Sequence, residues 1–152
     1  MSLHRCVYTS RGRNLGRADL DAILASCERN NPGRAITGML LFDRGHFVQL
    51  LEGPRAEVTA CFLTIGADPR HSDVHLLAAG PLDARLFADW SMHYVPEHGR
   101  RGDILRRYSA GQGFRPDELS IAGLEQICLE LAAAALSADP GPTPWPGPAS
   151  AA

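Results

Sequence analysis

The chain contains no lysine: all fifteen of its basic residues are arginine, and seventeen acidic residues balance them. The resulting formal net charge of −2 creates no field that favours nucleic acid or an anionic membrane surface. The sequence shows neither a signal peptide nor an apolar run long enough to span a bilayer. We therefore expect a soluble, cytoplasmic protein that binds neither nucleic acid nor membranes. Its 152 residues are enough for one domain with a hydrophobic core.

The chain also lacks the residue patterns of common metal, disulfide and nucleotide sites. The six histidines are scattered along the chain, and we expect no metal site. No glycine-rich dinucleotide or phosphate loop and no serine nucleophile elbow occurs. The four cysteines form no Cys-x-x-Cys pair and lie in apolar patterns, which favours buried free thiols. They are Cys6, Cys27, Cys61 and Cys128.

Residues 36–54 are the most informative stretch. Two apolar runs, Ile36–Phe42 and His46–Glu52, flank the short polar loop Asp43–Gly45, which predicts a β-hairpin. The second run carries one uncharged amide, Gln49, among apolar residues. A strand glutamine usually faces solvent. If Gln49 is buried instead, it needs hydrogen-bond partners, because leaving them unmade costs about 1–3 kcal/mol.

Elements on both sides of the hairpin complete a recognisable order. Apolar residues spaced i, i+3, i+4, i+7 predict a helix over Ala18–Asn30 and a second helix opened by Pro54. Strand patterns cover Leu3–Ser10, Val74–Ala79 and Leu86–Tyr94. The order predicts an α+β, ferredoxin-like βαββαββ fold, with a five-stranded sheet and two helices on one face.

The remainder of the chain predicts a helical appendage and a tail. Short and long helices are expected at Asp103–Tyr108 and Ile121–Ser137, the second capped by Ser120. We therefore divide the chain into a domain at 1–95, a helical cap at 96–137 and a tail at 138–152. The tail consists mainly of proline, glycine and alanine, so we expect it to be disordered.

A ferredoxin-like fold hosts many functions, so function has to come from individual residues. Tyr8 can be a core residue with its hydroxyl at an edge, and Asn30 and Asn31 can simply end a helix. Trp90 and Met92 can be core fillers. In a strand these last two residues, two positions apart, would point to the same face.

Taken together, these features resemble the BLUF family of blue-light receptors, which bind a flavin. The resemblance runs from Leu3 to Tyr94, and residues 95–137 resemble the helical cap of short, stand-alone members of the PixD type. The motifs that carry it are Val7-Tyr8-Thr9-Ser10, Asp19-Leu20-x-x-Ile23-Leu24, Asn30-Asn31-Pro32, Ile36-Thr37-Gly38-x-Leu40-Leu41, Gly45-x-Phe47-x-Gln49-x-Leu51-Glu52-Gly53, Asp68-Pro69-Arg70-His71 and Trp90-Ser91-Met92.

The resemblance implies a flavin, FAD or alternatively FMN, held without a covalent bond between the two helices. Ile23 and Ile65 would contact the two faces of its ring, and Asn31 would bond its C4 carbonyl and N3 edge. Gln49 would lie between the ring and the Tyr8 hydroxyl. The remaining implied cofactor-binding residues, at the pyrimidine side and the ring entrance, are Asn30, Asp68, Arg70 and His71.

The resemblance also implies a light sensor and no enzyme. Light would drive an electron and a proton from Tyr8 to the flavin, and their return would leave Gln49 rearranged. Trp90 and Met92 would pass the change to an unidentified partner protein, and we expect a homo-oligomer. Two alternatives stay open: a flavin-dependent redox enzyme, and a light-independent ferredoxin-like oligomer without cofactor.

Overall fold

A computed structural model of the chain describes residues 2–96, 99–109, 111 and 113–138. Apart from Ala138, the tail predicted to be disordered lies outside these residues. The strands are β1 (Leu3–Gly12), β2 (Thr37–Asp43), β3 (His46–Pro54), β4 (His71–Leu82) and β5 (His93–Tyr94). The helices are α1 (Arg17–Asn30), α2 (Arg55–Ala67), α3 (Arg101–Arg107) and α4 (Ile121–Ala138), with 3₁₀ turns at Pro32–Arg34 and Pro116–Glu118.

The five strands form one sheet in the order β4-β1-β3-β2-β5. All neighbours are antiparallel except β2 and β5, which are parallel. The register of β1 on β3 pairs Tyr8 with Gln49 and Arg5 with Glu52. Because successive side chains alternate between the faces of a strand, Gln49 and Glu52 point to opposite faces of the sheet. The predicted α+β, ferredoxin-like fold is confirmed.

The β2–β3 hairpin depends on two local features of the sequence. Arg44 and Gly45 form its turn with φ values of 48° and 83°, and two left-handed residues in succession match the twist of the strands they join. Gly38 lies so close to β3 that a Cβ atom there would be 1.9 Å from the Leu50 carbonyl oxygen. Glycine at this position therefore permits the close approach of β2 and β3.

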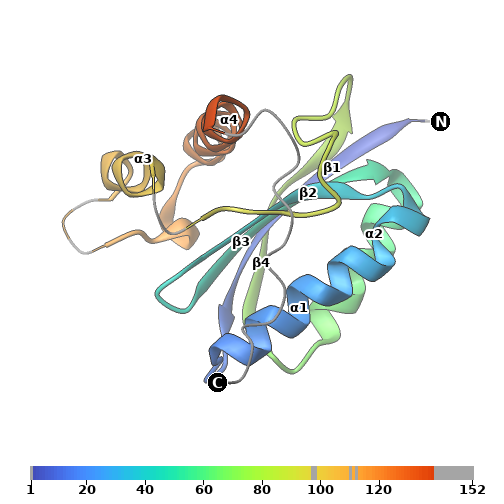
Figure 1. Ribbon diagram of the computed structural model, residues 1–152, viewed down its shortest axis with the longest axis horizontal. Coiled ribbons are helices and arrows are strands. Elements are labelled where there is room, and N and C mark those ends of the chain that lie inside the picture. The colour runs from blue at the N-terminus through green and yellow to red at the C-terminus, as the bar shows by residue number, and fades with distance from the viewer. Residues whose placement is uncertain (1, 97–98, 110, 112, 139–152) are drawn as a thin grey trace.

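Helices cover both faces of the sheet (Figure 1). The predicted pair, α1 and α2, packs on one face, where Leu20, Leu24 and Val58 join Leu51 in a buried apolar cluster. On the other face, α3 and α4 cover a second cluster. Buried members of this second cluster include Val7, Met39, Leu50, Ile104, Leu124, Ile127 and Leu131.

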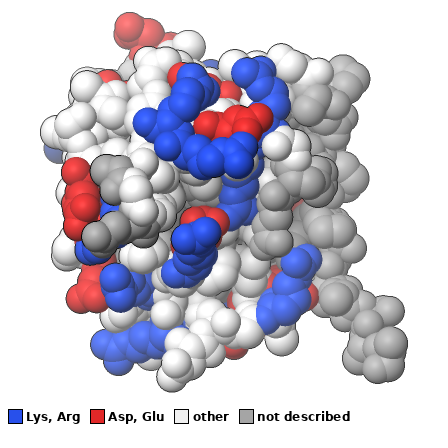
Figure 2. Space-filling view, turned by 90° about the vertical axis from the view of Figure 1, so that its left-hand side faces the viewer, with Lys and Arg blue, Asp and Glu red and all other residues white. Residues whose placement is uncertain are grey.

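The outer surface near α3 mixes charges of both signs. Figure 2 views the molecule from this side, and arginine side chains lie beside acidic ones over much of the face. Among the ion pairs of these helices, Arg107 reaches Glu130 at 2.7 Å, so that α3 is tied to α4. Such exposed pairs contribute little to stability, because water and salt screen them. The apolar contacts therefore do more to hold the two helices to the sheet.

The strand predicted for Leu86–Tyr94 is wrong except at its last two residues, His93–Tyr94. The backbone N–H groups of Leu86 and Phe87 donate to the carboxylate of Glu52 instead of to a neighbouring strand. A turn follows, in which the Trp90 N–H donates to the Phe87 carbonyl at 3.3 Å. The period-two rule therefore does not apply before residue 93.

The loss of this strand separates the two side chains that were expected on one face. Trp90 joins the apolar cluster under α3 and α4, whereas Met92 joins the cluster under α1 and α2. The prediction that both point the same way is therefore wrong. Residues 91 and 92 form a bend instead of extended strand, so the alternation of a strand does not hold between Trp90 and Met92.

Candidate functional site

A cavity of about 170 Å³ lies between α1 and α2, above the central strands. Three strands supply its floor through Tyr8, Leu40 and Gln49. Every predicted cofactor-binding residue lines this one cavity, whereas Trp90 and Met92 do not. The lining residues are Tyr8, Ile23, Ser26, Cys27, Asn30, Asn31, Arg34, Leu40, Gln49, Cys61, Thr64, Ile65, Asp68, Arg70 and His71.

Sequence reasoning missed part of this lining. Ser26 and Cys27 come from α1, and Cys61 and Thr64 come from α2. Helical spacing carries the signal that could have found them. Cys27 is four residues after Ile23, and Cys61 is four residues before Ile65, so each lies on the same helix face as a predicted site residue.

The floor of the cavity holds a hydrogen-bonded tyrosine and glutamine. Tyr8 and Gln49 are only 1% and 3% exposed. The Tyr8 hydroxyl donates to Gln49 Oε1, and Gln49 Nε2 donates to the Met92 sulfur at 3.4 Å. Gln49 therefore faces the interior with partners for both ends of its amide. An amide can exchange donor and acceptor positions by turning over, so this pair has two possible hydrogen-bond arrangements.

The Tyr8 hydroxyl is held in its neutral form. Burial raises its pKa well above the ordinary value of 10.0, and the nearby Cys27 and Cys61 raise it further. Burial likewise raises the pKa of Cys27 to about 12, so this thiol also stays protonated. A neutral phenol can give up both an electron and a proton, which a phenolate cannot do.

Polar side chains at the end of α2 provide a fixed cation in the lining. Arg70 Nη2 contacts Asp68 Oδ2 at 2.6 Å, and both side chains are partly exposed. The hydrogen bond from Arg70 lowers the pKa of Asp68, and the same contact raises the pKa of Arg70. This arrangement presents guanidinium N–H groups that suit the carbonyl or anionic groups of a ligand.

The asparagines at the end of α1 differ in burial. Asn30 is exposed, and its Nδ2 donates to Ser26 Oγ at 3.1 Å. Asn31 is 4% exposed, and its Nδ2 donates to the Ser91 carbonyl at 2.9 Å. The Asn31 side chain therefore links the cavity wall to the backbone between Trp90 and Met92.

His71 closes another side of the cavity. Its Nδ1 lies 2.8 Å from Ser10 Oγ, and its ring packs against Phe47 with centroids 4.8 Å apart. Burial lowers the pKa of His71 below 6.5, although the nearby Asp68 acts in the opposite direction. The folded protein therefore favours the neutral imidazole at this position.

Lowering the pH below about 6.5 should destabilise the protein through His71. Between its ordinary and its lowered pKa, the unfolded chain binds more protons than the folded chain, so acid favours unfolding. The stability that neutral His71 contributes is therefore lost as the pH falls through the folded-state pKa. Urea unfolding at several pH values should show this loss, and His71→Gln should flatten it. His75→Gln, at an exposed position of the same strand, should not.

Of the two predicted output residues, Met92 lies beside the cavity floor and Trp90 lies on the other face of the sheet. Met92 is 8% exposed and reaches Gln49 through its sulfur. Trp90 is 4% exposed and packs against the rings of Phe87 and His93, with centroid distances of 5.9 Å and 5.0 Å. Of the two residues, Met92 is therefore the one that contacts Gln49. Trp90 lies on the opposite face of the sheet.

Fold and cavity together define a ferredoxin-like domain with a cavity between α1 and α2. Residues 3–93 match the family model for BLUF, described as sensors of blue light using FAD. Since this match covers more than half of the chain, the chain belongs to the BLUF family of flavin-binding blue-light sensors, as its sequence motifs predicted.

Curated relatives are much longer proteins. The photoactivated adenylate cyclase subunit beta of Euglena gracilis is 42% identical over 98 residues, which are 63% of this chain and 11% of that protein. The blue light- and temperature-regulated antirepressor BluF of Escherichia coli (strain K12) is 36% identical over 88 residues, or 57% of this chain and 22% of that protein. The chain thus matches only a small part of either relative.

Two solved structures match over most of their own length. BlrB, a BLUF protein in its dark state, is 34% identical with a TM-score of 0.69, and the match covers 87% of this chain and 96% of BlrB. The photo-activated state of BlsA is 27% identical with a TM-score of 0.78, covering 86% of this chain and 94% of BlsA.

The part of the chain that the structure describes offers no candidate for a membrane span or a metal centre. No helix in this part of the chain combines the length and the apolar character that crossing a membrane requires. Nor do three or more His, Cys, Asp or Glu side chains gather there in a way that could hold a metal ion.

Proposed function

We propose that this chain is a blue-light receptor that switches through the Tyr8–Gln49 hydrogen bond at the floor of its cavity. The flavin is FAD, or alternatively FMN, bound without a covalent bond. The single observation that carries the proposal is the buried contact between the Tyr8 hydroxyl and Gln49 Oε1, in the same cavity that all the cofactor-binding candidates line.

The lining residues suit a flat, amphipathic ring. Ile23 on α1 and Ile65 on α2 offer apolar contacts from opposite helices. Asn31, Arg70 and Asp68 offer hydrogen-bond donors and acceptors for the polar edge of the ring, with Asn30 and His71 completing the polar lining. When bound, the flavin supplies absorption of blue light and, once excited, a strong oxidant.

The residues of this chain then carry the switch. Tyr8 would give up one electron and the proton of its hydroxyl to the excited flavin, and the return of both would restore the neutral phenol. While Tyr8 is oxidised, its oxygen no longer donates a hydrogen bond to Gln49 Oε1. The Gln49 amide then turns over or changes tautomer. No net oxidation or covalent change remains, so the result is a population shift between two hydrogen-bond arrangements, which relaxes in the dark.

Residues 90–92, which precede β5, would transmit the rearrangement of Gln49 to the surface. Gln49 Nε2 contacts the Met92 sulfur, so a reversed amide alters this contact directly. Trp90 lies under α3 and α4, and its movement would reach the surface of these helices. We propose that this surface signals to a partner protein, that the receptor forms a homo-oligomer, and that the chain itself catalyses no turnover of a substrate.

An absorption spectrum before and after blue light tests the proposal. The purified chain should be yellow, and blue light should shift its flavin band to longer wavelength in a manner that reverses in the dark. A protein that stays colourless after addition of both FAD and FMN would rule the function out. A bound flavin that turns over a reductant in the dark, with no light-induced shift, would favour a redox enzyme.

A further inference from the structure

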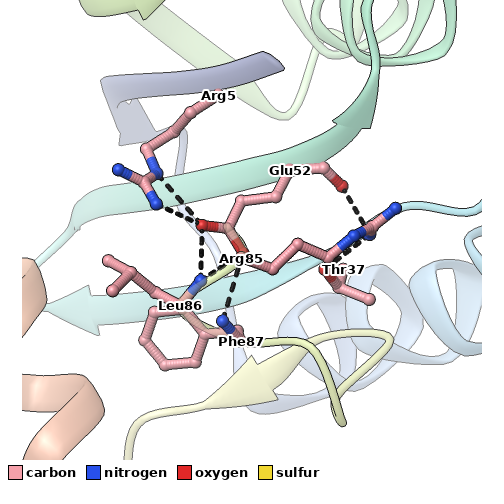
Figure 3. Close-up of polar contacts among 6 residues, drawn as sticks. All are labelled: Arg5, Thr37, Glu52, Arg85, Leu86 and Phe87. Atoms are coloured by element: carbon pink, nitrogen blue, oxygen red, sulfur yellow. Dashed lines mark hydrogen bonds and ion pairs between the residues drawn. The ribbon is translucent and has the colours of Figure 1, made fainter. Parts of the chain in front are cut away.

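A fully buried carboxylate lies three residues after the switch glutamine, on the other face of the sheet. Glu52 on β3 has a side chain that is 0% exposed. Arg5 on β1 donates to Glu52 Oε1 through Nε at 3.0 Å and Nη2 at 2.7 Å. The same carboxylate accepts from the backbone N–H groups of Leu86 at 2.9 Å and Phe87 at 3.1 Å (Figure 3).

Arg85, the residue before Leu86, is also bonded to Glu52, through the Glu52 backbone. Arg85 Nη1 donates to the backbone carbonyl of Glu52 at 3.2 Å and to Thr37 Oγ1 at 2.8 Å (Figure 3). Residues 85–87 are therefore all attached at Glu52. Removing partners from a buried carboxylate is strongly unfavourable, so this attachment strongly favours one position for residues 85–87 on β3.

The attached residues lead directly to the two output side chains. The Phe87 ring contacts the Trp90 ring, and the backbone N–H of Trp90 donates to the backbone carbonyl of Phe87 at 3.3 Å. Further along, Met92 contacts Gln49. Segment 85–92 is thus held to β3 at both ends, by Glu52 at its start on one face and by Gln49 at its end on the other.

We propose that Glu52 is a positioning residue for the light response. Its carboxylate fixes the start of segment 85–92, so that a change at Gln49 displaces Met92 and Trp90 instead of sliding the whole segment along the sheet edge. With its start fixed in this way, a displaced segment would be strained, and we include in the proposal that release of this strain favours the return in the dark. This inference rests on the proposed light-switch function.

Glu52→Gln tests this role, because it keeps the shape of the side chain and removes its charge. Flavin binding and the initial light-induced shift should remain, since Tyr8 and Gln49 lie on the opposite face. Dark recovery should slow by roughly tenfold, the change that one lost charged hydrogen bond can produce in a rate. The second measurement uses a Trp145→Phe background, in which Trp90 is the only tryptophan. There, Glu52→Gln should reduce the light-induced change in Trp90 fluorescence by about half or more, because the start of the segment is no longer fixed.

Two further variants make the result decisive. Glu130→Gln makes the same substitution in the ion pair between α3 and α4, and it should leave recovery and Trp90 fluorescence unchanged. Arg85→Gln weakens the attachment from the side of the segment at a half-buried residue, and it should slow recovery in the same direction. If Glu52→Gln does not fold, Arg85→Gln alone decides.

Wild-type recovery and an unchanged Trp90 signal in the folded variants of Glu52 and Arg85 would overturn the proposal. So would faster recovery in either variant, or equal slowing by Glu130→Gln. These outcomes differ from failure of the light-switch function itself, which would appear as a wild-type protein that shows no shift at all.

Discussion

Replacing Tyr8 with phenylalanine should abolish the light-induced shift of the flavin absorption band while flavin stays bound. The substitution removes only a hydroxyl group, so the apolar contacts of the ring, including its packing 5.5 Å from the Phe62 ring, are kept. Phenylalanine has no O–H proton to give and no donor for Gln49 Oε1. The spectrum before and after a blue-light pulse measures the effect.

Tyr108 on the C-terminal side of α3 provides the matched control for this experiment. Its hydroxyl contacts Glu130 at 3.4 Å, away from the cavity lining. Tyr108→Phe should therefore bind flavin and shift like the wild type. A normal, reversible shift in Tyr8→Phe would contradict the assigned electron and proton donor, even if the protein proves to be a light sensor.

Replacing Gln49 with leucine should also abolish the shift, with flavin still bound, because leucine has no second hydrogen-bond arrangement. This variant should in addition lose stability. It leaves the buried Tyr8 hydroxyl without its acceptor, and an unpaired buried polar group costs about 1–3 kcal/mol. Urea unfolding of the flavin-free proteins should measure that loss separately from flavin binding.

The double variant Tyr8→Phe/Gln49→Leu separates the two effects. Removing both partners of a buried hydrogen bond leaves no polar group unpaired, so the double variant should regain much of the stability lost by Gln49→Leu. It should still show no shift. Gln126→Leu, at an exposed position of α4, is the control and should change neither property. A normal shift in Gln49→Leu would refute the amide switch.

Local patterns made much of the fold predictable. The apolar runs around Asp43–Gly45 determine a hairpin, because a turn of two left-handed residues and the strands beside it are specified within a few positions. The helical spacing in α1 and α2 likewise identifies the faces that pack on the sheet. Tyr8, Ile23 and Gln49 could be recognised as site candidates because they occur in motifs, and all three line the cavity.

Other features depend on partners far apart in the chain, which no local pattern reveals. The contact of Tyr8 with Gln49 was implied only by the family resemblance, and the register of β1 on β3 produces it. The link from Asn31 to Ser91 joins a helix end to a turn. Helical spacing puts Cys27 and Cys61 on the same faces as Ile23 and Ile65, but only the packing of α1 beside α2 brings these faces to one cavity. Their positions became clear once the helices were placed on the sheet.

The sequence by itself determined the hairpin and the two helices over one face, since each follows from spacing within a short segment. Many of the residues around the cavity were indicated by motifs that resemble the BLUF family. Only the tertiary structure decided the path of residues 85–92. Their apolar character resembles a strand, yet Glu52 accepts the N–H groups of Leu86 and Phe87. A buried carboxylate needs such donors more than a sheet edge does. The chain therefore turns there, which places Met92 beside Gln49 and Trp90 on the opposite face.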